Sequence, residues 1–136
     1  MADDKGRWQA GLAAYASQFR IPEDEVYEYM RSRFGERLAT EGVLATGAAW
    51  TDDCLSLRDR SLVVVTTLAT QNGVEARLRT HVRWALDHGV TQEELEALAA
   101  LLAVYAGYPR ASTAIELFRE VIAEYGAEEQ RNQPLK

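Results

Sequence analysis

Residues 55–110 read LSLRDRSLVVVTTLATQNGVEARLRTHVRWALDHGVTQEELEALAALLAVYAGYPR and carry the strongest helix signals of the sequence. Their clearest local signal lies in TQEE, where Thr91 can cap a helix and Glu94, three residues later, completes a capping box. Just before this signal, Gly89 suits the left-handed residue that commonly ends a helix. We therefore expect one helix to end near His88 and a second to run from residue 92 to 105.

The segment LVVVTTLAT, within residues 57–70, fits either a buried strand or a buried helix. Its β-branched residues favour a strand. However, no other segment of the sequence offers a partner strand, and an isolated strand leaves its backbone hydrogen bonds unmade. We therefore interpret residues 57–70 as a helix whose local preference is overridden by packing.

Apolar residues recur at helical spacing over most of the remaining chain. The glycine- and alanine-rich stretch 42–53 is expected to be a loop, and the polar tail 127–136 is expected to be flexible. The prediction is one all-α domain over residues 1–136. Its other helices are expected over residues 6–19, 22–35, 74–88 and 109–126, and a short helix can also form over residues 36–42.

Composition limits the class of protein. At 136 residues the chain can bury a core of its own. The net charge of −6 argues against non-specific binding to nucleic acids or anionic membranes. The single cysteine, Cys54, gives no internal disulfide, and the N-terminus lacks the pattern of a signal peptide. We expect a soluble, cytoplasmic protein.

Charge is unevenly distributed along the sequence. Residues 58–89 carry five arginines but only three acidic residues, whereas both ends of the chain are acidic. A basic middle suits a small anionic ligand, and it suits a solvated helix face equally well.

In the expected helix over residues 74–88, His81 lies at the edge of the apolar stripe, with Arg77, Trp84 and His88 beside it. Such a histidine is either a hydrogen-bonded core residue or a catalytic group. Glu75 falls near the middle of the apolar sector, in the first turn. It is either a helix-dipole residue or an acid/base group whose pKa is raised by its setting. No zinc site is expected, because no third ligand joins the two histidines at metal-binding spacing.

Three motifs resemble those of the carboxymuconolactone decarboxylase family. They are LSLRDRSL at residues 55–62, HVRWALDHGVTQEE at residues 81–94 and YAGYPRA at residues 105–111. The pair Trp50-Thr51 is similar to one in the decarboxylase branch, and the resemblance covers about residues 50–122. The peroxidase branch of the family needs a Cys-x-x-Cys pair, and those positions hold Val74 and Arg77 here.

The resemblance implies an oligomeric, orthogonal multi-helix bundle of the alkylhydroperoxidase/carboxymuconolactone decarboxylase type. It implies decarboxylation of a small anionic unsaturated lactone, as in the breakdown of aromatic compounds. No cofactor or metal is required, because the lactone itself accepts the electrons. The implied assembly is a homo-oligomer (a dimer, a trimer, or a hexameric trimer of dimers), with no nucleic-acid or membrane partner.

The same resemblance suggests roles for individual residues. His81 is the candidate oxyanion donor or acid, and Glu75 the proton partner. A divergent lyase or isomerase acting on another lactone or keto acid is an alternative function, and so is a non-catalytic oligomeric ligand-binding or scaffold protein. The candidate substrate-binding residues are Arg58, Arg60, Arg77, Trp50 and Tyr105.

Overall fold

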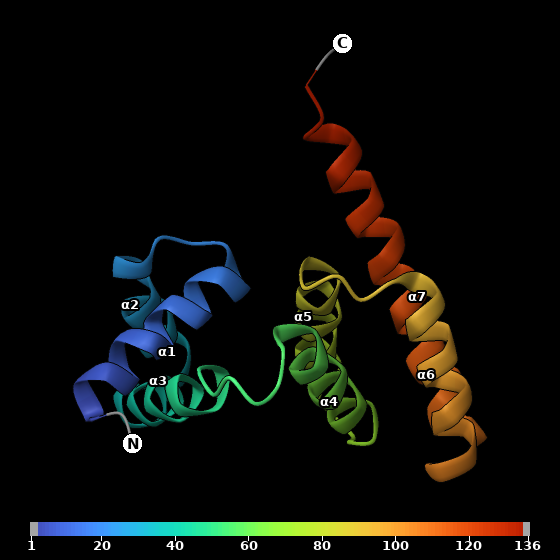
Figure 1. The fold of residues 1–136 in the computed structure, drawn as a ribbon, viewed down its shortest axis with the longest axis horizontal. Coiled ribbons are helices and arrows are strands. Elements are labelled where there is room, and N and C mark those ends of the chain that lie inside the picture. Colours follow the sequence, from blue (N-terminus) through green and yellow to red (C-terminus); the bar gives the residue numbers. More distant parts are fainter. Residues whose placement is uncertain (1–2, 135–136) are drawn as a thin grey trace. The chain divides into compact units, whose positions relative to one another are not determined.

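The computed structural model describes residues 3–134, which fold into seven helices and no strand (Figure 1). The prediction of an all-α fold is therefore confirmed. The chain divides into two compact units, residues 1–56 and residues 57–136. The expectation of one domain over residues 1–136 stays a prediction. Within residues 3–134 no helix is both long and apolar enough to cross a membrane.

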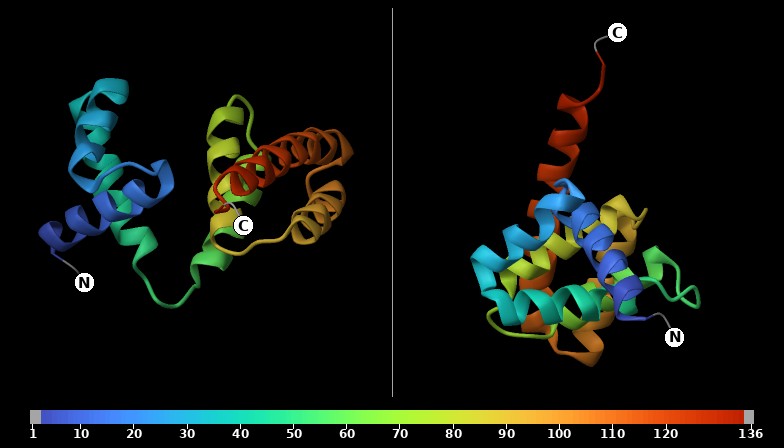
Figure 2. Two further views of the ribbon diagram at one scale, coloured as in Figure 1. Left: turned by 90° about the horizontal axis from the view of Figure 1, so that it is seen from above. Right: turned by 90° about the vertical axis from the view of Figure 1, so that its left-hand side faces the viewer.

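The first unit consists of three helices that pack on one another (Figures 1 and 2). They are α1 (Asp4–Phe19), α2 (Glu23–Phe34) and α3 (Glu36–Trp50). An aromatic layer surrounds a small aliphatic core in this unit. Trp8 packs against Tyr27 with ring centroids 5.0 Å apart, and Phe19 packs against Tyr29 at the same distance. The buried core residues are Val26, Met30, Ala39 and Val43.

Helix α3 corrects a prediction, because residues 42–50 are helical and do not form the expected loop. The small residues of this stretch lie where α3 crosses α1. A Cβ atom on Gly47 would lie 1.9 Å from the backbone carbonyl oxygen of Arg7. Glycine is needed here so that two helices can approach closely, and it does not mark a loop.

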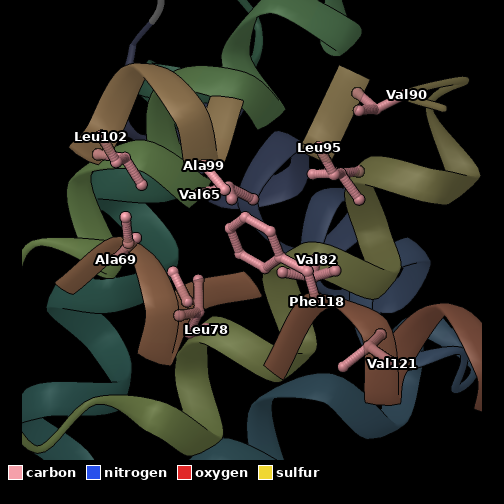
Figure 3. Close-up of a cluster of buried hydrophobic side chains, with 13 residues drawn as sticks. Val65, Ala69, Leu78, Val82, Val90, Leu95, Ala99, Leu102, Phe118 and Val121 are labelled. Carbon is pink, nitrogen blue, oxygen red and sulfur yellow. The ribbon is translucent and has the colours of Figure 1, made fainter. Parts of the chain in front are cut away.

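The second unit contains α4 (Leu57–Ala69), α5 (Glu75–Asp87), α6 (Gln92–Tyr105) and α7 (Tyr108–Arg131). Helix α7 packs along both α5 and α6, and its C-terminal turns extend past the N-terminal end of α6 (Figures 1 and 2). The core of this unit gathers around the fully buried ring of Phe118 (Figure 3). Val65, Leu78, Val82 and Ala99 are among the labelled side chains of the same buried cluster in the figure.

The predicted helix boundaries of the second unit are confirmed except at its C-terminal end. Thr91 and Glu94 form the expected capping box, and Gly89 is left-handed, with φ +89°. Helix α7, however, continues through Gly126 to Arg131, so residues 127–131 of the tail expected to be flexible are helical. Residues 135–136 lie outside the described residues. Helix α4 is helical as expected but buries only one face, since Val63 is 56% exposed.

Candidate active site

One face of α5 carries the ring-bearing side chains of the candidate site. The buried indole of Trp84 lies between two imidazoles, with its centroid 6.0 Å from that of His81 and 4.7 Å from that of His88. Arg77 is exposed and precedes His81 by four residues, which places it on the same face one turn earlier. The structure thus brings two of the predicted site residues, His81 and Arg77, onto one helical face.

His81 is half-buried, and burial lowers its pKa to about 4. Removing an imidazole from water disfavours its charged form. At neutral pH the ring is therefore uncharged, so it offers one N–H donor and one acceptor nitrogen. A neutral imidazole can donate a hydrogen bond to a developing oxyanion, but it is a poor general acid.

His88 follows the last residue of α5 and is tied to the start of α4. Its Nδ1 lies 2.7 Å from the hydroxyl oxygen of Ser61, which is buried. Burial also lowers the pKa of His88, while the nearby Asp87 charge and a hydrogen bond to the backbone of Leu57 oppose that shift. These two hydrogen bonds join α4 to the end of α5.

The arginines of α4 occupy different environments. Arg60 is buried, at 9% exposure, next to Ser61 in the sequence. Arg58 is half-buried and forms an ion pair with Glu94 at the start of α6. Glu94 also accepts a hydrogen bond from the backbone N–H of Thr91 at 2.9 Å, so one carboxylate serves both the capping box and the ion pair. Arg58 is thus held toward α6.

A separate cavity of about 370 Å³ lies between α4 and α6. Its wall is almost entirely apolar, with the Arg58–Glu94 pair and Tyr105 among its lining residues. His81 and Arg77 do not line it. The candidate substrate-binding residues are therefore divided, with Arg58 and Tyr105 at this cavity and Arg77 beside His81 on α5.

The two remaining candidates lie elsewhere. Trp50 ends α3 and belongs to the first unit. Glu75 occupies the first turn of α5 as expected, but its side chain is exposed, so the apolar setting expected for it is wrong. It lines a cavity of about 290 Å³ that Pro109 and Arg110 share. Its role in acid/base chemistry stays a prediction.

Sequence reasoning did not identify Ser61, Trp84 and His88 as parts of the site. Trp84 and His88 follow His81 by three and seven residues, so helical spacing already placed them near its face. The contact between Ser61 and His88 crosses 27 residues of sequence, and no local pattern marks it. Within residues 3–134, no group of three or more metal-binding side chains is present.

Comparison with known proteins connects this geometry to a family. The model of the carboxymuconolactone decarboxylase family matches residues 41–120, which begins earlier than the expected core at residue 50. A 4-carboxymuconolactone decarboxylase from Acinetobacter baylyi is 35% identical over 82 residues, which make up 60% of this chain. The aligned part also spans 60% of that relative's length. The family model covers more than half of the sequence and includes α4, α5 and α6, so the chain belongs to the carboxymuconolactone decarboxylase family.

Proposed function

We propose that this protein is a carboxy-lyase that removes carbon dioxide from a small anionic unsaturated lactone without a cofactor. Family membership and the similarity to a 4-carboxymuconolactone decarboxylase support the reaction class. The single observation that carries the site assignment is the half-buried His81, uncharged at neutral pH, on the same face of α5 as Arg77. A divergent lyase or isomerase acting on another lactone or keto acid would use the same arrangement.

The reaction sets the requirements for the site. The bond between the ring carbon and the leaving carboxylate breaks, and its electron pair moves through the conjugated double bond to the lactone carbonyl oxygen. The resulting dienolate is then protonated on carbon. The protein must therefore hold the substrate carboxylates, stabilise a developing oxyanion and allow a proton to be delivered.

His81 is suited to the oxyanion. A neutral imidazole donates an N–H hydrogen bond to the negative charge that develops in the transition state. Because it is uncharged, it does not bind the carboxylates of the ground-state substrate as a cation would. Its lowered pKa makes it a weaker candidate for the proton donor, because very little imidazolium exists at pH 7. Among the two roles expected for this residue, we favour the oxyanion donor.

Arg77 is the first candidate for binding a substrate carboxylate, because it is exposed one turn from His81. Arg60 is the second candidate, because it is a buried cation and directly precedes the buried Ser61 in the sequence. Arg58 is the third, since Glu94 already accepts from its guanidinium. Trp50 and Tyr105 stay candidate substrate-binding residues, and Glu75 stays the candidate proton partner.

Turnover of γ-carboxymuconolactone, followed by the loss of ultraviolet absorbance of its conjugated lactone, tests the proposal. We expect His81→Ala to lower kcat by at least roughly 100-fold, the usual effect of removing an oxyanion donor. Arg77→Ala should raise KM, while Arg79→Ala is the matched control. Arg79 lies on the same helix but is paired with Glu120 and Glu124 of α7. Activity unchanged in His81→Ala would overturn the site assignment, and no turnover of any lactone or keto acid would overturn the reaction class.

The apolar cavity between α4 and α6 supports a second candidate function, a non-catalytic ligand-binding protein. Its size is within the range of small-molecule sites, and its lining is mostly hydrophobic. Saturable binding of the lactone without turnover, abolished by Leu98→Trp in the cavity wall, would favour this candidate. Turnover that Leu98→Trp leaves intact would favour the enzyme.

We also propose that the protein is a cytoplasmic homo-oligomer, with a dimer, a trimer or a trimer of dimers as the candidate assemblies. Several large apolar side chains at the end of α6 and the start of α7 support this proposal, because they are mostly exposed in the single chain. Exposed apolar side chains that gather in one region commonly mark protein–protein contacts. These residues are Leu101, Val104, Tyr105 and Tyr108, at 62%, 75%, 87% and 74% exposure.

A further inference from the structure

The hydrogen bond between Ser61 and His88 connects two helices at a point where neither residue has an evident role in the fold's apolar core. Ser61 is only 2% exposed, and its hydroxyl oxygen lies 2.7 Å from Nδ1 of His88. The His88 ring is also hydrogen-bonded to the backbone of Leu57, one turn before Ser61 on α4. Hydrogen bonds with the buried Ser61 and with the backbone of Leu57 restrict the orientation of the half-buried His88 ring.

The partners of His88 determine which atom donates. A backbone carbonyl can only accept, so the imidazole must present an N–H to Leu57. A neutral imidazole carries one N–H, and its other nitrogen is an acceptor. Because Nδ1 faces the Ser61 hydroxyl at 2.7 Å, we infer that Nε2 supplies the N–H to Leu57, so that Nδ1 accepts and the hydroxyl of Ser61 donates. This arrangement selects the neutral ring with its proton on Nε2.

Trp84 lies next to both histidine rings, so the orientation of His88 can affect that of His81. Trp84 is 3% exposed, and its indole packs against the His88 ring, with the ring centroids 4.7 Å apart and the ring planes at 49°. The same indole also lies beside His81, with the two ring centroids 6.0 Å apart and the ring planes 57° apart. Because Trp84 is buried and closely packed, we expect a change in the tilt of His88 to displace the indole and, with it, the ring of His81.

A direct chemical role for Ser61 is a different interpretation of the same hydrogen bond, since a serine beside a histidine is the arrangement of an activated nucleophile. A nucleophile must reach the substrate. At 2% exposure the Ser61 side chain has almost no accessible surface, so the geometry favours a role in orienting other residues.

We propose that Ser61 and His88 are positioning residues that hold Trp84 and thereby set the orientation of the His81 ring. The proposal rests on the proposed function only in making His81 the group whose orientation matters for catalysis. The orientation itself is a property of the protein alone, and it is measurable without substrate.

Histidine-specific ¹⁵N labelling gives the direct test, because the chain has two histidines and both belong to this arrangement. Long-range ¹H–¹⁵N spectra at pH 7 should show His88 with its proton on Nε2. In Ser61→Ala the His88 pattern should change, and the ring resonances of His81 should move with it. Ser61→Thr, which keeps the hydroxyl, should restore the wild-type pattern. Thr66→Val is the matched control, because the Thr66 hydroxyl donates to Leu62 within the same helix.

Two outcomes of this experiment would overturn the proposal. One is a wild-type His88 with its proton on Nδ1, and the other is a His81 spectrum that Ser61→Ala leaves unchanged. If Ser61→Ala fails to fold, His88→Gln provides the second variant. It should shift the His81 resonances in the same direction, and an unshifted His81 in that variant would equally overturn the proposal.

Lactone turnover separates this proposal from the proposed function. Displacing an aligned group without removing it should lower kcat, roughly 10-fold in Ser61→Ala, with KM nearly unchanged. A KM effect with unchanged kcat would overturn the positioning role. If the wild-type protein turns over no lactone, the proposed function fails, while the spectra of His81 and His88 still decide whether Ser61 orients them.

Discussion

Gly11 of α1 lies directly against the backbone of Val43 in α3. A Cβ atom on Gly11 would be 1.9 Å from the carbonyl oxygen of Val43, far inside van der Waals contact. Gly47 makes the equivalent approach to Arg7 one turn further along α3. The two helices therefore cross with their backbones in contact, and the glycine on each side is a packing requirement.

The first prediction follows from this crossing. Gly47→Ala should lower the free energy of unfolding by about 2 kcal/mol or more, because the added methyl group must push two backbones apart. Urea unfolding followed by far-ultraviolet circular dichroism measures the effect. Gly126→Ala is the control, since Gly126 is also helical but has no neighbouring atom within 4 Å of an added Cβ. It should stabilise α7 by about 0.5–1 kcal/mol. Equal effects of the two substitutions would contradict the packing role.

The same crossing explains where sequence reasoning about the fold succeeds and where it fails. Helices marked by apolar spacing or by a capping box, such as the one that starts after Thr91, are predicted within a few residues. The stretch 42–50 is wrongly predicted as a loop because glycine and alanine have no large side chain to show a helical period. Gly126 misleads in the opposite direction, since the helix passes through it and ends at Arg131. Whether a glycine ends a helix or lies within one depends on which residues pack against it, and these residues can be far away in the sequence.

The second prediction concerns His81 and acid stability. Its pKa falls from 6.5 to about 4 on folding, so below pH 6.5 the unfolded chain binds a proton that the folded chain does not. Stability from this group is therefore complete above pH 6.5 and is lost as the pH falls toward 4, by roughly 3 kcal/mol in total. Urea midpoints of the wild type and His81→Gln, measured between pH 7 and pH 4, isolate the effect.

Carboxylates also titrate in this range, so the informative quantity is the difference between the two proteins. The wild type should lose more stability than His81→Gln, which carries no ionisable group at this position. Parallel stability curves would contradict a buried, neutral His81. An NMR titration of the His81 ring with a midpoint near the ordinary histidine value of about 6.5 would contradict it directly.

The candidate site is predictable only in part, because some of its contacts join residues that are far apart in the sequence. His81 and Arg77 share one face of one helix, so helical spacing alone brings them together. The partners of Arg58 and Ser61 lie 36 and 27 residues away, on or beside other helices. Which face of α4 turns toward α6 and which toward α5 is decided by packing of the whole unit. The sequence therefore identifies arginines as cations without showing which of them are already paired.

The third prediction addresses the pair between Arg58 and Glu94. Glu94→Ala should cost about 1 kcal/mol or more, because it removes both the capping-box acceptor for Thr91 and the partner of Arg58. Arg58→Ala removes only the partly exposed ion pair, which is worth about 0.2–1 kcal/mol. Chemical unfolding of both single variants and the double variant measures the coupling. If Arg58 also binds substrate, Arg58→Ala will raise KM under conditions in which the variant is still fully folded. Identical costs for the two single variants would contradict the double role of Glu94.

The fourth prediction concerns the exposed apolar surface at the end of α6. Val104 is 75% exposed and is followed by the still more exposed Tyr105. In an oligomer such side chains are expected to be covered by another copy of the chain, and a buried carboxylate at this position would then be strongly unfavourable. Val104→Glu should therefore shift the mass measured by light scattering toward that of the single chain, 15.2 kDa. Glu96→Lys, an exposed charge change on the same helix, should leave the assembly intact. A wild-type protein that is already monomeric, or a Val104→Glu variant with unchanged mass, would show that this surface is not the contact between copies.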